Sequence, residues 1–341
     1  MIAGLIIILL LVLFLPFTKP IGRNLEVFLF IMGVASVLVS QVLSTELIVE
    51  ALREPIGITI AVLVAGLLFK WFQSSFERGV LTVSRAMPFP LFIALFVIVL
   101  GLISSVITAI IAAIILVSVL SVLKLDRKTE IRLVIIACYA IGMGAALTPL
   151  GEPLSTIVVS KLNESFFYLL DLVGIYVIPG VIAFGVFAAF IVRGRKTENI
   201  ATDNQGISAT ETESYGEIII RSLKIYLFVM ALTFLGAGFQ PFIERFLLDL
   251  NPLVLYWINM ISAVLDNATL AAAEISPEMG VTTVRDILLG LIISGGMLIP
   301  GNIPNIIAAG KLKISSLDYA KFAFPIGLVV MVIYFIIILF V

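Results

Sequence analysis

Asp266, Asn267 and Thr269 stand close together in a long run of otherwise apolar residues. Their side-chain oxygens suit a hard cation such as sodium better than a soft metal. A charged group among apolar neighbours is energetically costly, so it indicates a functional site. The alternative is a loop at a surface, where Asp266 would be solvated. Glu274, five residues after Thr269, could face the same site or reach toward an interface, and both alternatives stand.

Two further polar clusters interrupt apolar segments through paired prolines. The first, TPLGEP, carries Thr148 and Glu152, and the second, PGNIPN, carries Asn302 and Asn305. Proline removes a backbone donor and prevents a continuous helix. The freed carbonyl groups and helix ends can then bind ions through their dipoles. The alternative is a simple kink in a packing helix, but the polar residues favour a binding function.

Ser105 and Thr108 form a weaker counterpart, in a Ser-Ser-Val-Ile-Thr run that also interrupts an apolar segment. Their hydroxyl groups could equally bond back to a carbonyl of their own helix. No Lys or Arg falls in any of the four clusters, whereas Glu152 and Asp266 occupy related places. Because apolar surroundings favour the neutral form of a carboxyl group, such a group can trade a proton for a cation. The clusters therefore predict ion binding and exchange.

The composition places these clusters in a membrane protein. Of the 341 residues, 61% are apolar and 13% are charged, and the mean hydropathy is +1.23. Soluble globular chains have about 45–50% apolar and about 25% charged residues. Histidine is absent and Cys138 is the single cysteine, which excludes a disulfide, a thiolate–zinc cluster and histidine-based acid–base chemistry.

A membrane-crossing helix needs about 20 mostly apolar residues. Simple crossings of this length are predicted at 1–17, 25–45, 55–72, 165–192, 218–238 and 320–341. Segments 91–123 and 252–275 are predicted to be re-entrant hairpins with polar tips. Segments 131–161 and 284–310 are predicted to be spans broken at the proline clusters. Irregular backbone at membrane depth persists only where it is buried in protein or lines a wet cavity, so we expect the tips and the breaks to meet.

The chain contains an internal repeat. One spacing of a glycine and two prolines occurs twice, as Gly144, Pro149 and Pro153 and as Gly295, Pro300 and Pro304. We divide the chain into N-terminal scaffold spans (1–54), a first repeat (55–192), a polar linker (193–217) and a second repeat (218–341). Each repeat has the order span, surface arm, hairpin, broken span and span. An odd number of crossings inverts the second copy. We therefore expect an all-α polytopic membrane protein with about eight transmembrane helices, two re-entrant hairpins and two inverted-topology repeats.

The distribution of charge predicts the orientation. With this topology, one side of the membrane holds all but four of the 21 Lys and Arg residues, the exceptions being Arg53, Lys161, Arg245 and Arg285. The positive-inside rule makes that side cytoplasmic. We expect a multi-pass protein of the cell membrane, with the linker in the cytoplasm and both termini outside.

A hairpin with a polar tip, followed by a span broken at TPLGEP, resembles the ion transporter superfamily. That group includes divalent anion/sodium symporters, citrate–metal carriers, arsenite pumps and NhaD-type sodium/proton antiporters. The chain is most similar to a largely archaeal branch of predicted cation transporters, over about residues 55–341. The first tip departs from the Ser-Asn-Thr of the symporters. The resemblance implies a homodimer and an elevator type of transporter, hinged on surface arms near 73–89 and 240–251. It also implies two half-sites: Ser105, Thr108, Thr148 and Glu152, and Asp266, Asn267, Thr269, Asn302 and Asn305.

The carboxylates favour a secondary active transporter that exchanges sodium, or another cation, for protons. Glu152, Asp266, Asn267 and Thr269 are the expected cation ligands, with sodium as the transported or coupling ion and no other cofactor. The alternative is a sodium-coupled anion symporter, since helix N-termini at the breaks could hold an anion. An enzyme is not expected, because the chain lacks histidine and any Gly-x-Gly-Asp run. The expected partners are membrane lipid and a second copy of the chain, and no nucleic acid.

Overall fold

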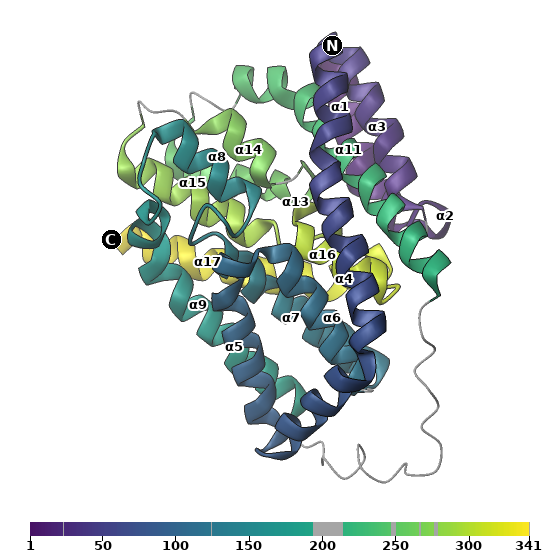
Figure 1. Ribbon diagram of the computed structural model, residues 1–341. Coiled ribbons are helices and arrows are strands. Elements are labelled where there is room, and N and C mark those ends of the chain that lie inside the picture. The colour runs from purple at the N-terminus through teal and green to yellow at the C-terminus, as the bar shows by residue number, and fades with distance from the viewer. Residues whose placement is uncertain are drawn as a thin grey trace.

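A computed structural model describes residues 1–22, 24–123, 125–193, 214–246, 250–265, 267–275 and 279–340. All regular elements in these ranges are α-helices or short 3-10 helices (Figure 1). Four helices of the described part are long and apolar enough to cross a membrane: α5 (Phe89–Ile107), α9 (Tyr168–Val192), α11 (Tyr215–Phe246, up to Phe242) and α17 (Ser316–Phe340). The prediction of an all-α membrane protein is confirmed at this level. The eight crossings and the elevator movement stay predictions.

Apolar side chains cover the outside of these helices. Ile175 on α9 is 76% exposed and Val329 on α17 is 59% exposed, and neither helix carries a charged residue in its middle. A soluble helix would turn polar residues outward. Surfaces of this kind are covered by lipid in a membrane-embedded protein.

The N-terminal helices α1 (Ile2–Phe14) and α3 (Leu25–Ser40) lie beside α11, at the upper right of Figure 1. The Ser36 hydroxyl donates to its own-helix carbonyl at Gly33 (2.7 Å) and lies 3.3 Å from the Phe234 carbonyl oxygen of α11. The Phe30 and Phe234 rings pack with their centroids 6.0 Å apart. The expected scaffold spans therefore pack on the first helix of the second half of the chain.

α4 (Thr45–Arg85) is one continuous helix of 41 residues, whereas a crossing at 55–72 and a separate arm at 73–89 were expected. Ser44 caps its start by accepting a hydrogen bond from the Leu47 backbone N–H. Between Phe69 and Arg78 the sequence has neither glycine nor proline, so nothing interrupts the helix before Pro88. At 1.5 Å per residue it is about 60 Å long, twice the roughly 30 Å of a bilayer core.

The remaining helices lie within the segments predicted as hairpins and broken spans, except for the short α2 near the N-terminus. They are α2 (Lys19–Gly22), α6 (Ala109–Leu123), α7 (Arg127–Ala145), α8 (Pro153–Leu162), α12 (Pro252–Ile258), α13 (Ser262–Leu265), α14 (Asn267–Glu274), α15 (Val281–Ser294) and α16 (Ile303–Lys311). α5 and α6 pack on each other and are separated by Thr108 alone. Break one, residues 146–152, separates α7 from α8. Break two, residues 295–302, separates α15 from α16 and contains a 3-10 turn at Ile299–Gly301.

In each half of the chain, a helix of the predicted hairpin packs on the broken span of the other half. α6, the returning leg of the first hairpin, packs on α16 beyond break two, and α14, the returning leg of the second, packs on α8 beyond break one. Figure 1 shows α8 and α14 together at the upper left and α6 and α16 together near the centre. The helices after both breaks also end alike. Asn163 (φ 53°) and Lys313 (φ 52°) adopt left-handed backbone, and the next N–H of each bonds back into its helix, as in a Schellman cap.

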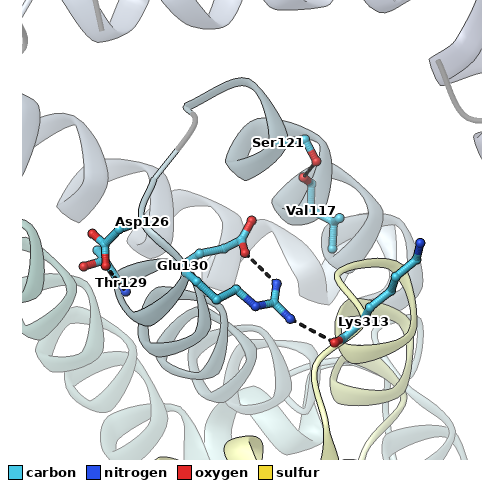
Figure 2. A network of polar contacts seen from close by, with 7 residues as sticks. Val117, Ser121, Asp126, Thr129, Glu130 and Lys313 are labelled. Carbon is cyan, nitrogen blue, oxygen red and sulfur yellow. Dashed lines mark hydrogen bonds and ion pairs between the residues drawn. The ribbon is translucent and has the colours of Figure 1, made fainter. Parts of the chain in front are cut away.

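A polar network ties the start of α7 to the end of α16 (Figure 2). The Arg127 guanidinium donates to the Glu130 carboxylate (2.8 Å) and to the Lys313 carbonyl oxygen (2.9 Å). Asp126 caps α7 by accepting from the Thr129 N–H (3.1 Å). A hydrogen bond thus joins the first broken span, at the start of α7, to the second, just beyond α16.

Candidate functional site

The tip of the first hairpin lies against break one. The Ala109 N–H donates to the Gly151 carbonyl oxygen (2.8 Å), and the Thr148 hydroxyl donates to the Ser105 carbonyl oxygen. These bonds satisfy backbone groups that the two interruptions release from their helices. Thr148, Ser105 and Thr108, predicted to share a half-site, therefore lie in one small region.

The hydroxyl groups of this tip have local partners. Ser105 donates back to the Leu102 carbonyl oxygen (2.7 Å), which is the alternative that the sequence left open. Thr108 has φ 74° and ψ 149°, and its hydroxyl oxygen accepts from the Ile111 N–H (3.4 Å) at the start of α6. Thr108 thus turns the chain and caps the returning helix.

Hairpin one is held against α7 by a close approach of backbone. A Cβ on Gly144 would collide with the Gly101 carbonyl oxygen, a backbone atom that cannot move aside. Beside this contact the Ser104 hydroxyl lies 2.6 Å from the Gly101 carbonyl oxygen and 3.0 Å from that of Ile141. Gly144, found in the sequence as a landmark of the repeat, is required here for packing.

Break two is closed by Asn305. Its side-chain nitrogen Nδ2 donates to the carbonyl oxygens of Gly295 and Leu298, both at 2.9 Å, and the residue is fully buried. Its Oδ1 has no hydrogen-bond partner within the described ranges. Asn305 therefore holds the broken backbone with one end of its amide, and the other end is left as an acceptor.

Break two lies against α7, the helix that leads into break one. Asn302 is 4% exposed, and a Cβ on Gly142 of α7 would collide with its Nδ2. One turn earlier on α7, the Tyr139 ring lies against Gly296 of break two, and its hydroxyl donates to the Ala323 carbonyl oxygen (2.8 Å). The first tip thus contacts break one, and break two contacts the helix before break one, whereas the expected meeting of both breaks stays a prediction.

The second tip is described in part. Asp266 lies outside the described residues, and so does the side chain of Thr269. Asn267 begins α14 and is 3% exposed, with its Nδ2 lying 3.3 Å from the position that a Cβ on Gly295 would take. Nδ2 donates to no acceptor among the described residues. The start of α14 thus faces the start of break two.

Two carboxyl groups are buried in this part of the molecule. Glu152 is the last residue of break one, directly before α8, and is 5% exposed. Glu274 ends α14 and is 1% exposed, which places its side chain inside the protein. Within the described ranges no three His, Cys, Asp or Glu residues gather as a multi-carboxylate metal centre would require. The oxygens at hand, from single carboxylates, amides and carbonyls, suit a monovalent hard cation.

Sequence reasoning missed three buried polar residues of the second half. Asn259 is fully buried and lies beside Glu274. Ser262 and Ser294 are fully buried with their hydroxyl oxygens 2.6 Å apart, and Ser294 also approaches the Asn259 carbonyl oxygen (2.8 Å). Asn259 is the only one with a signal in the sequence, as a lone amide among Trp, Ile and Met.

A family model described as "Protein of unknown function (DUF1646)" matches residues 2–341. No curated protein sequence matches the chain.

Proposed function

We propose that this chain, which belongs to the DUF1646 family, is a secondary active transporter that exchanges sodium, or another monovalent cation, for protons. One observation carries the proposal. A buried carboxyl group, Glu152, ends a helix break that lies against a hairpin tip, in a protein whose outer helices are apolar. Broken helices and buried acids are costly in a membrane, and ion binding is the function that best accounts for both.

The chemistry of exchange follows from the burial. A carboxyl group in apolar surroundings is stable when it is neutral, either by holding a proton or by pairing with a cation. The two occupants compete for one position, so the cation can bind only when the proton leaves. Backbone carbonyls at the first tip and the free Oδ1 of Asn305 would supply further hard oxygen ligands. Asp266, next to Asn267, is the second proposed carboxylate.

Anion symport is the weaker candidate. An anion would bind at the helix N-termini of the breaks, but α8 begins with Pro153 and α16 has Pro304 in its first turn, and proline has no N–H to donate. Glu152 already places a carboxyl group at the start of α8. The distinguishing experiment uses the purified protein in vesicles: cation/proton exchange proceeds when chloride is replaced by gluconate, and labelled dicarboxylate or phosphate is not taken up. Anion uptake that depends on sodium would refute exchange.

The inverted repeat and its orientation are part of the proposal. The exchanged packing of α6 on α16 and α14 on α8 and the matching ends of α8 and α16 support two copies of one unit. The distribution of basic residues supports a cytoplasmic linker. A movement of the hairpins and broken spans as one body would bend the first half at residues 86–88, because α4 is continuous up to Arg85. A homodimer would present two such bodies.

Labelling with a membrane-impermeant thiol reagent tests the orientation. On a Cys138→Ala background, Ser208→Cys should react only from the cytoplasmic side. Ser208 lies in the linker, outside the described residues. Glu46→Cys, at the exposed start of α4, is the matched control and should react only from outside. Reaction of Ser208→Cys in intact cells would reverse the proposed orientation.

A further inference from the structure

Glu274 and Asn259 form a buried polar pair that the exchange mechanism above does not use. Glu274 is 1% exposed and Asn259 is fully buried. Both carboxyl oxygens of Glu274 and both side-chain atoms of Asn259 lack a hydrogen-bond partner in the described part of the chain, although the two side chains lie beside each other. Buried polar groups without partners are rare and costly. Here a carboxyl group and an amide that lie beside each other are both buried without a hydrogen-bond partner among the described residues.

Other polar groups connect the Glu274–Asn259 pair to break two. The Asn259 carbonyl oxygen lies 2.8 Å from the Ser294 hydroxyl, and Ser294 is followed by Gly295, which faces Asn267. Asn267 and Glu274 are seven residues apart on α14, so they share one face of that helix. A line of polar atoms therefore leads from the second tip to Glu274, along the contact of α14 with α15.

Charged groups on the neighbouring elements leave Glu274 without an ion pair. Lys161 of α8 donates to the Ile275 carbonyl oxygen (3.3 Å). On α15, Asp286 pairs with Arg285 (2.9 Å). α11 carries Lys224 near its start and Glu244 and Arg245 in its last turn, with no charge in between. Among the described ion pairs none involves Glu274, so its charge must be neutralised by something that binds.

The first half of the chain shows that the fold does not require this cluster. Aligning Thr108 with Thr269 and Pro149 with Pro300 places an apolar residue opposite each of three polar members: Ile98 for Asn259, Ala113 for Glu274 and Met143 for Ser294. Ala113 packs in a fully apolar contact between α6 and α16, with Ile307. One copy of the unit is therefore stable without the polar residues, which points to a use other than folding.

We infer that Glu274 and Asn259 form an ion-binding position separate from the tips, occupied in turn by a proton on the Glu274 carboxylate or by a monovalent cation between that carboxylate and the Asn259 Oδ1. In the protonated state the acid can donate to Oδ1 and accept from Nδ2 of the amide. In the cation-bound state both residues supply hard oxygens. The inference rests on the proposed exchange for its role in transport, but binding to the position is measured without transport.

The test uses the purified full-length chain in detergent. Its Tm is followed as sodium replaces choline at constant ionic strength, and the protons released on sodium addition are followed in weak buffer. Glu274→Gln and Asn259→Leu should each raise the sodium concentration needed for half of the Tm increase about tenfold or more. Glu274→Gln should also release fewer protons per chain than the unchanged chain does, because only the carboxylates at the tips and breaks would then exchange a proton for sodium. Asp286→Asn, which changes a buried carboxyl group paired with Arg285, is the matched control and should retain both responses.

Each outcome decides the inference. If Glu274→Gln and Asn259→Leu are folded and respond to sodium as the unchanged chain does, the pair is only structural and the inference is wrong. If the unchanged chain responds to none of sodium, lithium and potassium, it is also wrong. If the chain exchanges ions in vesicles and Glu274→Gln releases as many protons per chain as the unchanged chain, the proposed function stands and this position is refuted. If the chain does not exchange ions in vesicles but its sodium response in detergent depends on Glu274, the proposed function is wrong and the ion-binding position stands.

Discussion

Asp266→Asn should reduce cation-driven proton flux to that of vesicles without protein, while the chain still folds and inserts. The position directly precedes α14, whose first residue, Asn267, faces break two. Asparagine keeps the size and hydrogen-bonding capacity of the side chain and removes its charge, so the exchange chemistry alone is tested. Neutralising a carboxylate inside the membrane also removes a desolvation cost, and insertion should not suffer. Proton flux is read from a pH-sensitive dye inside the vesicles.

The companion change, Glu152→Gln, separates the roles of the two carboxylates. It should either abolish the flux as well or shift its pH optimum, according to which group carries the proton. Asp171→Asn and Glu164→Gln are the matched controls, since both of these carboxylates are exposed, and both variants should keep full flux. Anion symport predicts the opposite sign, because removing a buried carboxylate would leave anion uptake intact or improve it. Full exchange by both Asp266→Asn and Glu152→Gln would refute the antiport mechanism.

Asn305→Ala should destabilise the protein more than Asn302→Ala, a change of the same kind in the same break. The substitution leaves the Gly295 and Leu298 carbonyl oxygens without their 2.9 Å donors in a fully buried place. The Leu298 carbonyl oxygen keeps the Gly301 N–H as a donor (3.3 Å), whereas the Gly295 carbonyl oxygen keeps none among the described residues. One unsatisfied buried acceptor costs about 1–3 kcal/mol, equivalent to a fall in Tm of roughly 2–10 °C. The Tm of the purified chain in detergent measures this directly.

Asn302→Ala is the contrast for that measurement. Asn302 lies in the same break and is 4% exposed, but its side chain makes no hydrogen bond to the described residues and packs against Gly142. Its loss should therefore lower Tm by much less, while still weakening ion binding if the breaks form the site. Equal effects of the two substitutions on Tm would contradict the role given to Asn305.

The two helix breaks could be located from the sequence because their signals are local. Paired prolines stop a helix wherever they occur, and both breaks lie at those residues. The continuous α4 was missed for the converse reason: the polar run after Lys70 looks like a change of environment, yet without glycine or proline the helix continues through it. Hydropathy reports the surroundings of a segment and does not determine where a helix ends.

The candidate site could be predicted only where polarity and irregular backbone coincide. Thr148, Asn302 and Asn305 were found because they lie within the breaks. Glu274 could not be placed, since its burial depends on α14 packing on α8, α11 and α15, a contact between distant parts of the chain. Ser262 and Ser294 were missed because serine is common in membrane helices, and its hydroxyl usually bonds back to its own helix.

Cation-dependent proton movement by the purified chain in vesicles tests the central claim most directly. Sodium, lithium, potassium or choline chloride is added outside at several pH values, with chloride replaced by gluconate as a check. The proposed exchanger moves protons out of the vesicles when at least one of the small cations is added, with no response to choline and no requirement for chloride. Proton movement that is the same with choline as with every small cation at all pH values would contradict cation/proton exchange by this protein.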